Sequence, residues 1–345
     1  MIQMNEIRLS VIIPTFNSSN TIERLIHSMS NQIFKDFELI FIDDNSSDDT
    51  VNIIRKTLEN FPMVHQIHVN ETNNGPGYSR NRGIEKANGD YIVFIDSDDV
   101  VREDHLSSLY DNIKDYDSVF IKGIKVDDEG NLFNFKVDRF DPLVELSIKN
   151  NHVVKAVDII NLELLMKIPF SFVFLLYKKD IILNNDIRFN EEFRYAEDTE
   201  FAMKYLSNCG EVKFVNKYTY YYYQEKGSIS DSIAFKRFDS IILFEDLNVY
   251  FNDLSIYNPI FKELSDKLVH SRTPKFVFGN MNYFLYNDYD KDEVFKKMDE
   301  LNLFDKLKDF KSFSKGDGKF KLKIVLFSLS PNMYYKLWKR LKNRI

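Results

Sequence analysis

Hydrophobic and polar positions follow two different periods in the first hundred residues. Short runs rich in Val, Ile, Leu and Phe are typical of buried strands, and they occupy residues 9–14, 37–42, 64–69 and 91–95. Between these runs the apolar residues recur every three or four positions, which predicts amphipathic helices. The first such helix carries Ile22, Leu25, Ile26 and Met29, the second starts after residues 46–49, and the third covers residues 78–86.

This alternation of strands and helices predicts the fold class. Strand, helix and strand in regular succession indicate an open, mostly parallel α/β sheet with right-handed crossovers. Ligands of such sheets bind at the carboxyl ends of the strands. Three polar clusters follow predicted strands and are therefore expected at one edge of the sheet, namely residues 15–17, 43–44 and 96–98.

Length, charge and cysteine content exclude several classes of protein. A chain of 345 residues is long enough for about two domains. The net charge of −7 argues against a nucleic-acid-binding protein, which needs an excess of Lys and Arg. The single Cys209 excludes an intramolecular disulfide and a Cys-rich zinc site. Because no signal-peptide pattern and no apolar run of about 20 residues is found, we expect a cytoplasmic protein.

Asp96 and Asp98 form a candidate metal site. Two residues apart in extended chain, their carboxylates point to the same side, and such hard oxygen ligands suit Mg²⁺ or Mn²⁺. An isolated Asp-x-Asp is more often an acidic surface turn. The two other polar clusters on the same predicted sheet edge favour the metal interpretation.

Four ordered motifs and a later fifth carry a resemblance to a known family. They are SVIIPTFN at residues 10–17, IDDNSSDDT at 42–50, NGPGYSRNRG at 74–83, IDSDD at 95–99 and AEDTEF at 196–201. The chain resembles the family 2 glycosyltransferases of the GT-A fold over about residues 8–230. The resemblance implies a catalytic domain at residues 1–230, with a nucleotide-sugar half at about 1–100 and an acceptor half at about 101–230. A helical region follows at residues 231–345.

The resemblance also implies roles for individual residues of the motifs. Pro14, Thr15, Asn17, Asn74 and Ser97 would line the site of the nucleotide sugar. Asp44 would accept a hydrogen bond from the uracil or ribose, and Arg80 would lie near the nucleotide or the sugar. Asp98 would bind the metal directly, whereas Asp96 would contact either the metal or the ribose.

Glu197 and Asp198 form the candidate catalytic pair. By the resemblance, Asp198 would be the general base, and the repulsion of a nearby Glu197 carboxylate would raise its pKa. One base opposite one leaving group implies a single displacement with inversion at the anomeric carbon. The alternative is an acidic pair that only stabilises the start of a helix.

The segment after the tyrosine-rich residues 218–223 departs from the pattern of the family. Relatives often carry Arg or His before a Ser-x-Ser sequence, and this chain has Gln224 and no His there. We expect Lys226 to supply the missing cation and Ser228 and Ser230 to donate to the diphosphate.

The last 35 residues are basic in an otherwise acidic chain. Residues 311–345 hold ten Lys or Arg and one acidic residue, Asp317. A helix starting at Ser330-Pro331 would carry one apolar stripe, formed by Met333, Tyr334, Leu337, Trp338, Leu341 and Ile345. Such a helix can lie peripherally on the inner face of the cell membrane through residues 331–345. It can also pack on its own domain or on a second subunit in a homo-oligomer.

The sequence thus predicts a metal-dependent, inverting glycosyltransferase. It would move a hexose or N-acetylhexosamine from a UDP-sugar to a bacterial cell-surface glycan or a wall-polymer acceptor of the polyol-phosphate type. A sugar-nucleotidyltransferase is one alternative, but residues 14–20 contain no Lys or Arg for a triphosphate. A non-catalytic scaffold that binds sugar nucleotides is another, and the intact Asp96, Asp98 and Asp198 argue against it.

Overall fold

The chain divides into two compact units. The computed structural model describes residues 7–61, 63–127, 140–148, 150–223, 235–287, 289–313 and 317–342. The first unit, called the sheet unit below, comprises Met1–Ile160 and Lys167–Ser232. The second, called the helical unit, comprises Asn161–Met166 and Ile233–Ile345.

Four parallel strands form the first half of the central sheet, in the spatial order β3-β2-β1-β4. Their bounds are β1 (Leu9–Thr15), β2 (Phe37–Asp43), β3 (Val64–Val69) and β4 (Tyr91–Phe94). All seven residues of β2 are buried, as expected of a parallel strand covered on both faces. At the edge strand β3, Val64 and Val69 are exposed. The four strands predicted from the apolar runs are therefore confirmed.

The second half of the sheet is mixed. Strand β8 pairs antiparallel with β4 and with β6, and β6 pairs parallel with the long β9. Two short strands pair antiparallel with β9 at different points along it. The bounds are β5 (Val100–Val101), β6 (Ser118–Val126), β7 (Val153–Lys155), β8 (Leu175–Lys178) and β9 (Glu211–Tyr223). Bulges interrupt the pairing of β6 with β9 around Lys122.

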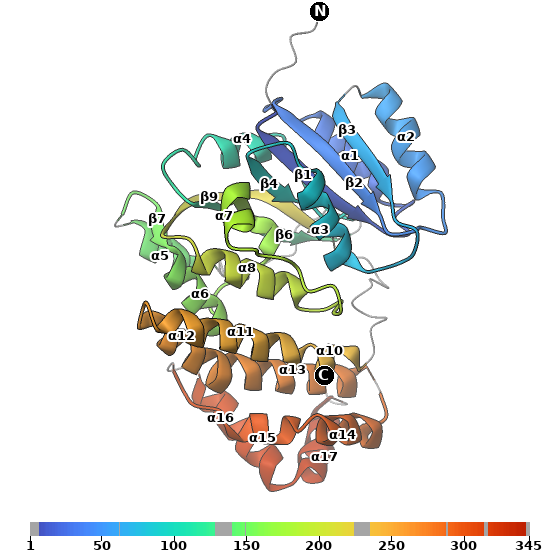
Figure 1. The fold of residues 1–345 in the computed structure, drawn as a ribbon. Coiled ribbons are helices and arrows are strands. Elements are labelled where there is room, and N and C mark those ends of the chain that lie inside the picture. The colour runs from blue at the N-terminus through green and yellow to red at the C-terminus, as the bar shows by residue number, and fades with distance from the viewer. Residues whose placement is uncertain are drawn as a thin grey trace, which may run out of the picture. The chain divides into compact units, whose positions relative to one another are not determined.

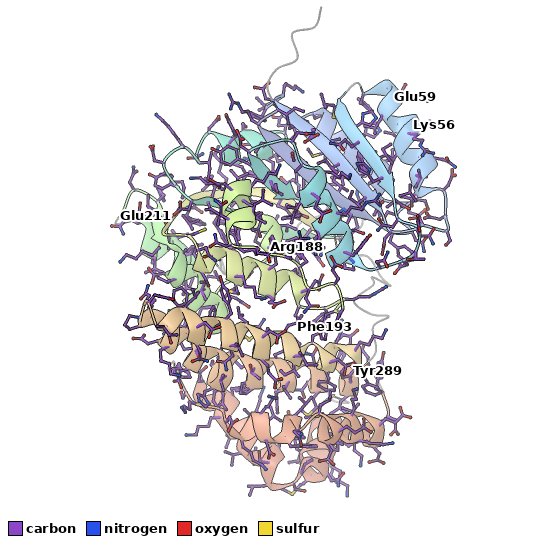
Figure 2. The ribbon with its side chains drawn as sticks, viewed as in Figure 1. Lys56, Glu59, Arg188, Phe193, Glu211 and Tyr289 are labelled. Carbon is purple, nitrogen blue, oxygen red and sulfur yellow. The ribbon has the colours of Figure 1, made fainter. Side chains whose placement is uncertain are left out.

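Helices flank this sheet (Figure 1). The chain moves from β1 through β2 to the edge strand β3, and then crosses back to β4 on the other side of β1. Because the crossovers are right-handed, α1 and α2 lie together on one face of the sheet and α3 lies on the other. On α2, Ile54 and Leu58 are buried, while Lys56 and Glu59 face outward (Figure 2). The bounds are α1 (Ile22–Ser30), α2 (Thr50–Asn60), α3 (Pro76–Lys86), α4 (His105–Tyr110), α5 (Asp141–Ile148), α6 (Ala156–Leu164), η1 (Phe172–Phe174), α7 (Lys179–Asn184) and α8 (Glu197–Ser207).

Aromatic side chains fill the core beneath β4. The ring of Phe94 meets those of Tyr177 and Phe189 edge-on, each at 5.3 Å between ring centroids. Phe189 in turn stacks on Phe201 of α8 at 3.8 Å. Edge-to-face and stacked contacts of this kind add to the free energy gained by burial. This aromatic core joins β4 to α8 and so fixes the two elements that carry the candidate site.

The helical unit is built from helices that pack through aromatic and aliphatic side chains. A buried ion pair joins Lys275 and Asp317 at 3.0 Å. The bounds are α10 (Lys236–Asp239), α11 (Ile241–Ser255), α12 (Ile260–Lys267), η2 (Leu268–Arg272), α13 (Thr273–Tyr286), α14 (Lys291–Glu300), α15 (Leu303–Lys308), α16 (Asp317–Leu329) and α17 (Pro331–Lys342). None of the helices within the described ranges is long and apolar enough to cross a membrane.

The two last helices leave apolar side chains uncovered. On α17, which begins at Pro331 as predicted, Tyr334 packs on Phe278 and Phe327, whereas Met333 and Leu337 are exposed. Helix α16 carries a second exposed stripe, which the sequence analysis missed, formed by Leu322, Val325, Leu326 and Leu329. The side chain of Trp338 and residues 343–345 lie outside the described part of the chain.

Candidate active site

The carboxyl ends of β1 and β2 are tied together by hydrogen bonds. Thr15 donates from its hydroxyl to Asp43 at 3.0 Å, and the backbone N–H of Ser46 donates to the same carboxylate at 2.8 Å. Asn17, in the left-handed conformation at φ 49°, accepts from the N–H of Ser47 at 2.9 Å. Pro14 directly precedes Thr15 near the end of β1 and is partly exposed. The structure therefore brings the predicted residues Pro14, Thr15 and Asn17 to one sheet edge.

Asp44 holds the glycine-containing turn before α3. Its carboxylate accepts from the backbone N–H of Asn74 at 2.9 Å and of Gly75 at 2.7 Å, and from the side chain of Asn70 at 2.8 Å. Gly75 has φ 95°, a conformation that favours glycine. A carboxylate has about four acceptor positions, so these three donors leave room for one more. Contact of Asp44 with the uracil or ribose stays a prediction.

The acidic segment Asp96–Asp99 forms a turn directly after β4. The N–H of Asp99 donates to the carbonyl oxygen of Asp96 at 3.1 Å, so Asp96 and Asp98 do not lie in extended chain. The expectation that alternation along a strand aligns their carboxylates is therefore wrong; the strand ends at Phe94 and the turn sets their positions. The hydroxyls of Ser97 and Ser18 are 2.7 Å apart, and Arg24 donates to the carbonyl of Asp98 at 2.7 Å.

Asp99 anchors this turn in the core. It is fully buried and accepts from the hydroxyl of Tyr220 at 2.5 Å and from the N–H of Tyr223 at 3.0 Å. Burial raises the pKa of Asp99 well above its usual range, and the charges of Asp98 and Asp96 raise it further. Burial and the two acidic neighbours thus favour the protonated form of Asp99.

That Asp96 and Asp98 hold a divalent cation stays a prediction. No set of three or more His, Cys, Asp and Glu side chains within the described ranges forms a metal cage. Mg²⁺ and related ions, however, are commonly held by one or two carboxylates together with water and substrate phosphates. After burial, the charges of Asp98 and Asp96 are the next causes of the raised pKa of Asp99, and a bound cation would offset these charges.

Arg80 connects the acidic turn to the predicted catalytic pair. Its guanidinium donates to Asp96 at 2.9 Å and to Glu197 at 3.0 Å. The centre of the Phe172 ring lies 4.5 Å from the guanidinium carbon of Arg80, and Nε of Arg80 is buried without a hydrogen-bond partner among the residues that the structure describes. Buried charges of opposite sign in this arrangement depend on one another, because removing one leaves the others uncompensated.

Asp198 lies at the start of α8, next to this ion pair. Ala196 precedes the helix in the left-handed conformation at φ 71°, and the carboxylate of Asp198 accepts from the N–H of Thr199 at 2.6 Å. Burial raises the pKa of Glu197 to about 7; the charge of Asp198 adds to this rise and Arg80 opposes it. Burial also raises the pKa of Asp198, against the opposing effect of Arg80. The charge of Asp96 raises the pKa of Asp198 as well, so the acidic turn and the start of α8 influence each other electrostatically.

Some functional candidates were missed by sequence reasoning, and others cannot be placed. The buried Tyr220 and the ring of Phe172 support the site, and the sequence analysis gave neither of them a role. Lys226, Ser228 and Ser230 lie outside the described residues.

Comparison with known proteins assigns the family. A sequence model described as "Glycosyl transferase family 2" matches residues 10–181. The chain is 30% identical to the poly(ribitol-phosphate) β-N-acetylglucosaminyltransferase TarP of Staphylococcus aureus, over 80% of this chain and 84% of TarP. The chain belongs to glycosyltransferase family 2. The predicted family is thereby confirmed.

Relatives of this family also support the fold. The chain is 29% identical to TarS of Staphylococcus aureus, a second poly(ribitol-phosphate) β-N-acetylglucosaminyltransferase, over 62% of this chain but only 35% of TarS. The crystal structure of TarS 1–349 in complex with UDP-GlcNAc has a TM-score of 0.62 and 26% identity, covering 79% of this chain and 75% of that one. The predicted GT-A fold of the family is confirmed by this likeness.

Proposed function

We propose that this chain transfers a hexose or N-acetylhexosamine from a UDP-sugar to a hydroxyl of a cell-wall polymer or related surface glycan. The observation that supports the proposal is the bridge of Arg80 between Asp96 and Glu197, which links the acidic turn after β4 to the residue that precedes Asp198. The names of TarS and TarP, and the UDP-GlcNAc in the TarS complex, support an N-acetylglucosamine donor and a polyol-phosphate acceptor.

Asp198 is the proposed general base. It accepts the proton of the acceptor hydroxyl while the acceptor oxygen bonds to the anomeric carbon and the bond from that carbon to the diphosphate breaks. A base of this kind typically contributes about 10²–10⁴-fold in rate. An ordinary Asp is a weak base, and the raised pKa of Asp198 makes it a better proton acceptor. One base and one leaving group give inversion.

Asp96 and Asp98 are the residues proposed to hold Mg²⁺ or Mn²⁺. When bound, the ion supplies positive charge to the leaving diphosphate. Arg80 keeps the carboxylate of Asp96 oriented, and Tyr220 holds the turn through Asp99. Asp44, Asn74 and Ser97 position the loops around the nucleotide.

The basic C-terminal helices are the proposed site of membrane contact. Exposed apolar side chains of α16 and α17 lie on helices that also carry Lys319, Lys321, Lys323, Lys336 and Lys339. Apolar groups beside lysines suit an anionic lipid surface. Flotation with anionic liposomes, with and without residues 317–345, tests this contact. A defined oligomer that leaves liposomes unbound would assign the same surface to subunit contact.

The replacement Asp198→Asn tests the catalytic proposal. We expect it to abolish transfer from UDP-GlcNAc while changing UDP affinity by less than about threefold, since the amide keeps the size of the side chain but cannot take the proton. Asp186→Asn is the control, because Asp186 is 92% exposed and outside the site. Transfer is measured by UDP release, and inversion by the anomeric configuration of the product. If Asp198→Asn keeps substantial turnover, Asp198 is not the base. If the wild type binds sugar nucleotides without turnover, the chain is a scaffold.

A further inference from the structure

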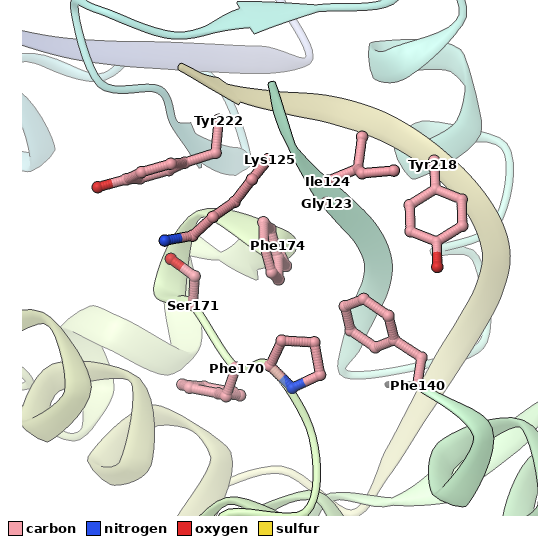
Figure 3. Close-up of a pocket in the computed structure, with 10 residues that line it drawn as sticks. Gly123, Ile124, Lys125, Phe140, Phe170, Ser171, Phe174, Tyr218 and Tyr222 are labelled. Carbon is pink, nitrogen blue, oxygen red and sulfur yellow. The ribbon is translucent and has the colours of Figure 1, made fainter. Parts of the chain in front are cut away.

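An aromatic cavity lies in the sheet unit beside the candidate active site. Its volume is about 400 Å³, and most of its lining comes from β6, β9 and the segment around η1. The described lining residues are Gly123, Ile124, Lys125, Phe140, Pro169, Phe170, Ser171, Phe174, Tyr218 and Tyr222 (Figure 3). A cavity of this size accommodates a small-molecule group such as a sugar or polyol unit.

The bulged pairing of β6 with β9 creates this cavity. Ile121 is paired with Val215, but the next residue, Lys122, is paired with Tyr218, so β9 contains extra residues at this point. Bulges of this kind bend a strand and redirect its side chains. Gly123 allows Phe174 to lie against the strand, since a Cβ at Gly123 would be 2.1 Å from the ring. The cavity is therefore built into the sheet by two specific local features.

Sequence neighbours connect the cavity lining to the candidate active site, since Tyr223, next to the lining residue Tyr222, donates from its N–H to Asp99. Phe172 packs under Arg80, while Ser171 and Phe174 on either side of it line the cavity. Tyr222 lines the cavity too, and its pKa is raised by burial and then by the charges of Asp99, Asp96 and Asp98. The Tyr222 side chain thus lies within the electrostatic field of the acidic turn. A group held in the cavity would therefore lie near the segments that carry the acidic turn and Arg80.

The described part of the lining combines aromatic rings with the charged side chain of Lys125. Phe140, Phe170, Phe174 and the two tyrosines offer apolar faces, on which the C–H faces of a sugar or polyol can pack. Lys125 is the cation among the described lining residues, and it is exposed. Figure 3 shows its amine and the hydroxyl of Ser171 turned toward each other, on the side where Tyr222 lies. One lysine and one hydroxyl match a singly charged group such as a phosphodiester better than a diphosphate, which carries more charge.

We propose that this cavity is an acceptor subsite that packs one sugar or polyol unit on its aromatic walls while Lys125 and Ser171 bind the adjoining phosphodiester. The proposal rests on the proposed function, because it assumes that an acceptor hydroxyl is presented to Asp198. The proposal adds a chemical requirement for the acceptor. A negatively charged phosphodiester must adjoin the sugar or polyol unit that packs in the cavity.

Two variants test the subsite. Lys125→Met keeps the length of the side chain and removes its charge, and Phe170→Leu keeps an apolar side chain and removes the ring. The probes are short oligomers of ribitol phosphate and of glycerol phosphate, with ribitol and glycerol as their neutral counterparts. Lys155→Met is the matched control, since Lys155 is exposed on β7 and outside the cavity lining.

We expect the wild type to bind at least one phosphodiester oligomer more tightly than its neutral counterpart. Lys125→Met should weaken this binding about tenfold or more, as expected for loss of a hydrogen bond to a charged group. Phe170→Leu should weaken it about twofold to tenfold. Both variants should keep the wild-type KM for UDP-GlcNAc and the wild-type rate of UDP release without acceptor.

Three results would overturn the subsite. One is wild-type affinity for the oligomers in both variants; another is an equal affinity of the wild type for charged and neutral probes. A rise in KM for UDP-GlcNAc in Lys125→Met would assign the cavity to the donor instead. Absence of UDP release from every sugar nucleotide in the wild type would contradict the proposed function itself, a result separate from these three.

Discussion

The guanidinium of Arg80 donates to the carboxylate of Glu197 at 3.0 Å, and both side chains are less than one-tenth exposed. The same guanidinium donates to Asp96 at 2.9 Å. Arg80 is thus the cation that holds the acidic turn after β4 and the start of α8 at a fixed separation. The chemistry proposed for this site depends on that separation, because the base must lie close to the anomeric carbon of the donor.

Replacing Arg80 by Met should destabilise the protein strongly. Loss of one partner from a buried ion pair costs about 3–5 kcal/mol, because the remaining charges stay buried without compensation. Arg188→Met is the control, since Arg188 pairs with Glu85 at the surface, where a pair is worth about 1 kcal/mol or less. Urea unfolding of the two variants gives the comparison. Equal losses of stability would show that Arg80 is not the structural link described here.

The rate of transfer should fall on the acidic side at a higher pH than an ordinary Asp would give. If Asp198 is the base, transfer needs its ionised carboxylate, and burial raises the pKa of that group. Asp198 raises the pKa of Glu197 by repulsion, and this interaction is mutual, so Glu197→Gln should move the acidic limb of kcat/KM to lower pH. The control is the pH profile of Glu192→Gln, since Glu192 is exposed. An unchanged limb in Glu197→Gln would separate Glu197 from the titration.

The raised pKa of Glu197 predicts a dependence of the protein's stability on pH. The pKa of the Glu197 carboxyl rises from about 4.3 in the unfolded chain to about 7 in the folded protein. At any pH between these two values, the folded state therefore binds more protons than the unfolded state. The contribution of this carboxyl to stability is full below the unfolded pKa and is lost as pH rises toward 7. Thermal unfolding should show the wild type losing stability relative to Glu197→Gln across this window. A parallel course of the two curves would contradict the raised pKa.

Chelation should test the carboxylates of the acidic turn. If Asp96 and Asp98 hold the ion, EDTA abolishes transfer and Mn²⁺ or Mg²⁺ restores it. In the absence of substrate, UDP with Mn²⁺ should raise Tm more than UDP alone, because ligand binding stabilises the fold by mass action. Asp98→Asn should lose this additional rise, whereas the exposed Asp180→Asn should keep it. Full activity after exhaustive chelation would remove the metal from the mechanism.

Asp44→Asn should weaken nucleotide binding through the turn that Asp44 holds. An amide has one acceptor oxygen, so it can no longer serve both the N–H of Asn74 and that of Gly75 as the carboxylate does. We expect UDP affinity to fall about tenfold, in line with loss of a charge-assisted hydrogen bond. Calorimetry with UDP provides the measurement, and Asp90→Asn at the surface is the control. Unchanged affinity would mean that the turn does not contribute to the nucleotide site.

Gly83→Ala should destabilise the contact of α3 with β1. A Cβ at Gly83 would lie 2.3 Å from a methyl group of the buried Ile12, and overpacking of this kind costs about 1–3 kcal/mol. Gly279→Ala on α13 is the control, because a Cβ there meets no atom within 4 Å. Alanine in an open helical position should stabilise the fold by about 0.5–1 kcal/mol. Urea titration should therefore move the two midpoints in opposite directions.

The parallel half of the sheet could be predicted because its information is local. A strand buried on both faces has to be apolar nearly throughout, so residues 37–42 were sufficient to find β2 (Phe37–Asp43). The start of α17 was equally local, since Ser330 accepts from the N–H of Met333 as a helix cap. The bounds of such elements are determined by residues that are close together in the sequence.

The assembly of the site could not be predicted, because its contacts join distant segments. Nothing near Arg80 in sequence indicates that it pairs with Glu197 rather than with the nucleotide. The bulge around Lys122 depends on the pairing of two strands that are far apart in the chain. The sequence around Asp96–Asp99 predicts extended chain rather than a turn, since the hydroxyl of Tyr220 that anchors the turn comes from the distant β9. The catalytic and metal-binding roles of these residues stay predictions.

The long separation between Arg80 and Glu197 has a consequence for the newly made chain. The two residues are 117 positions apart, and Tyr220, which anchors Asp99, follows later still. Domains form from the N-terminus onward during synthesis, at about 5–20 residues per second, so the acidic turn leaves the ribosome several seconds before its partners. During that interval the nascent chain has the carboxylates proposed for the donor but lacks the base and the anchor of the turn. If Asp198 is the base, the catalytic site is therefore complete only once β9, the last strand of the sheet, has been made.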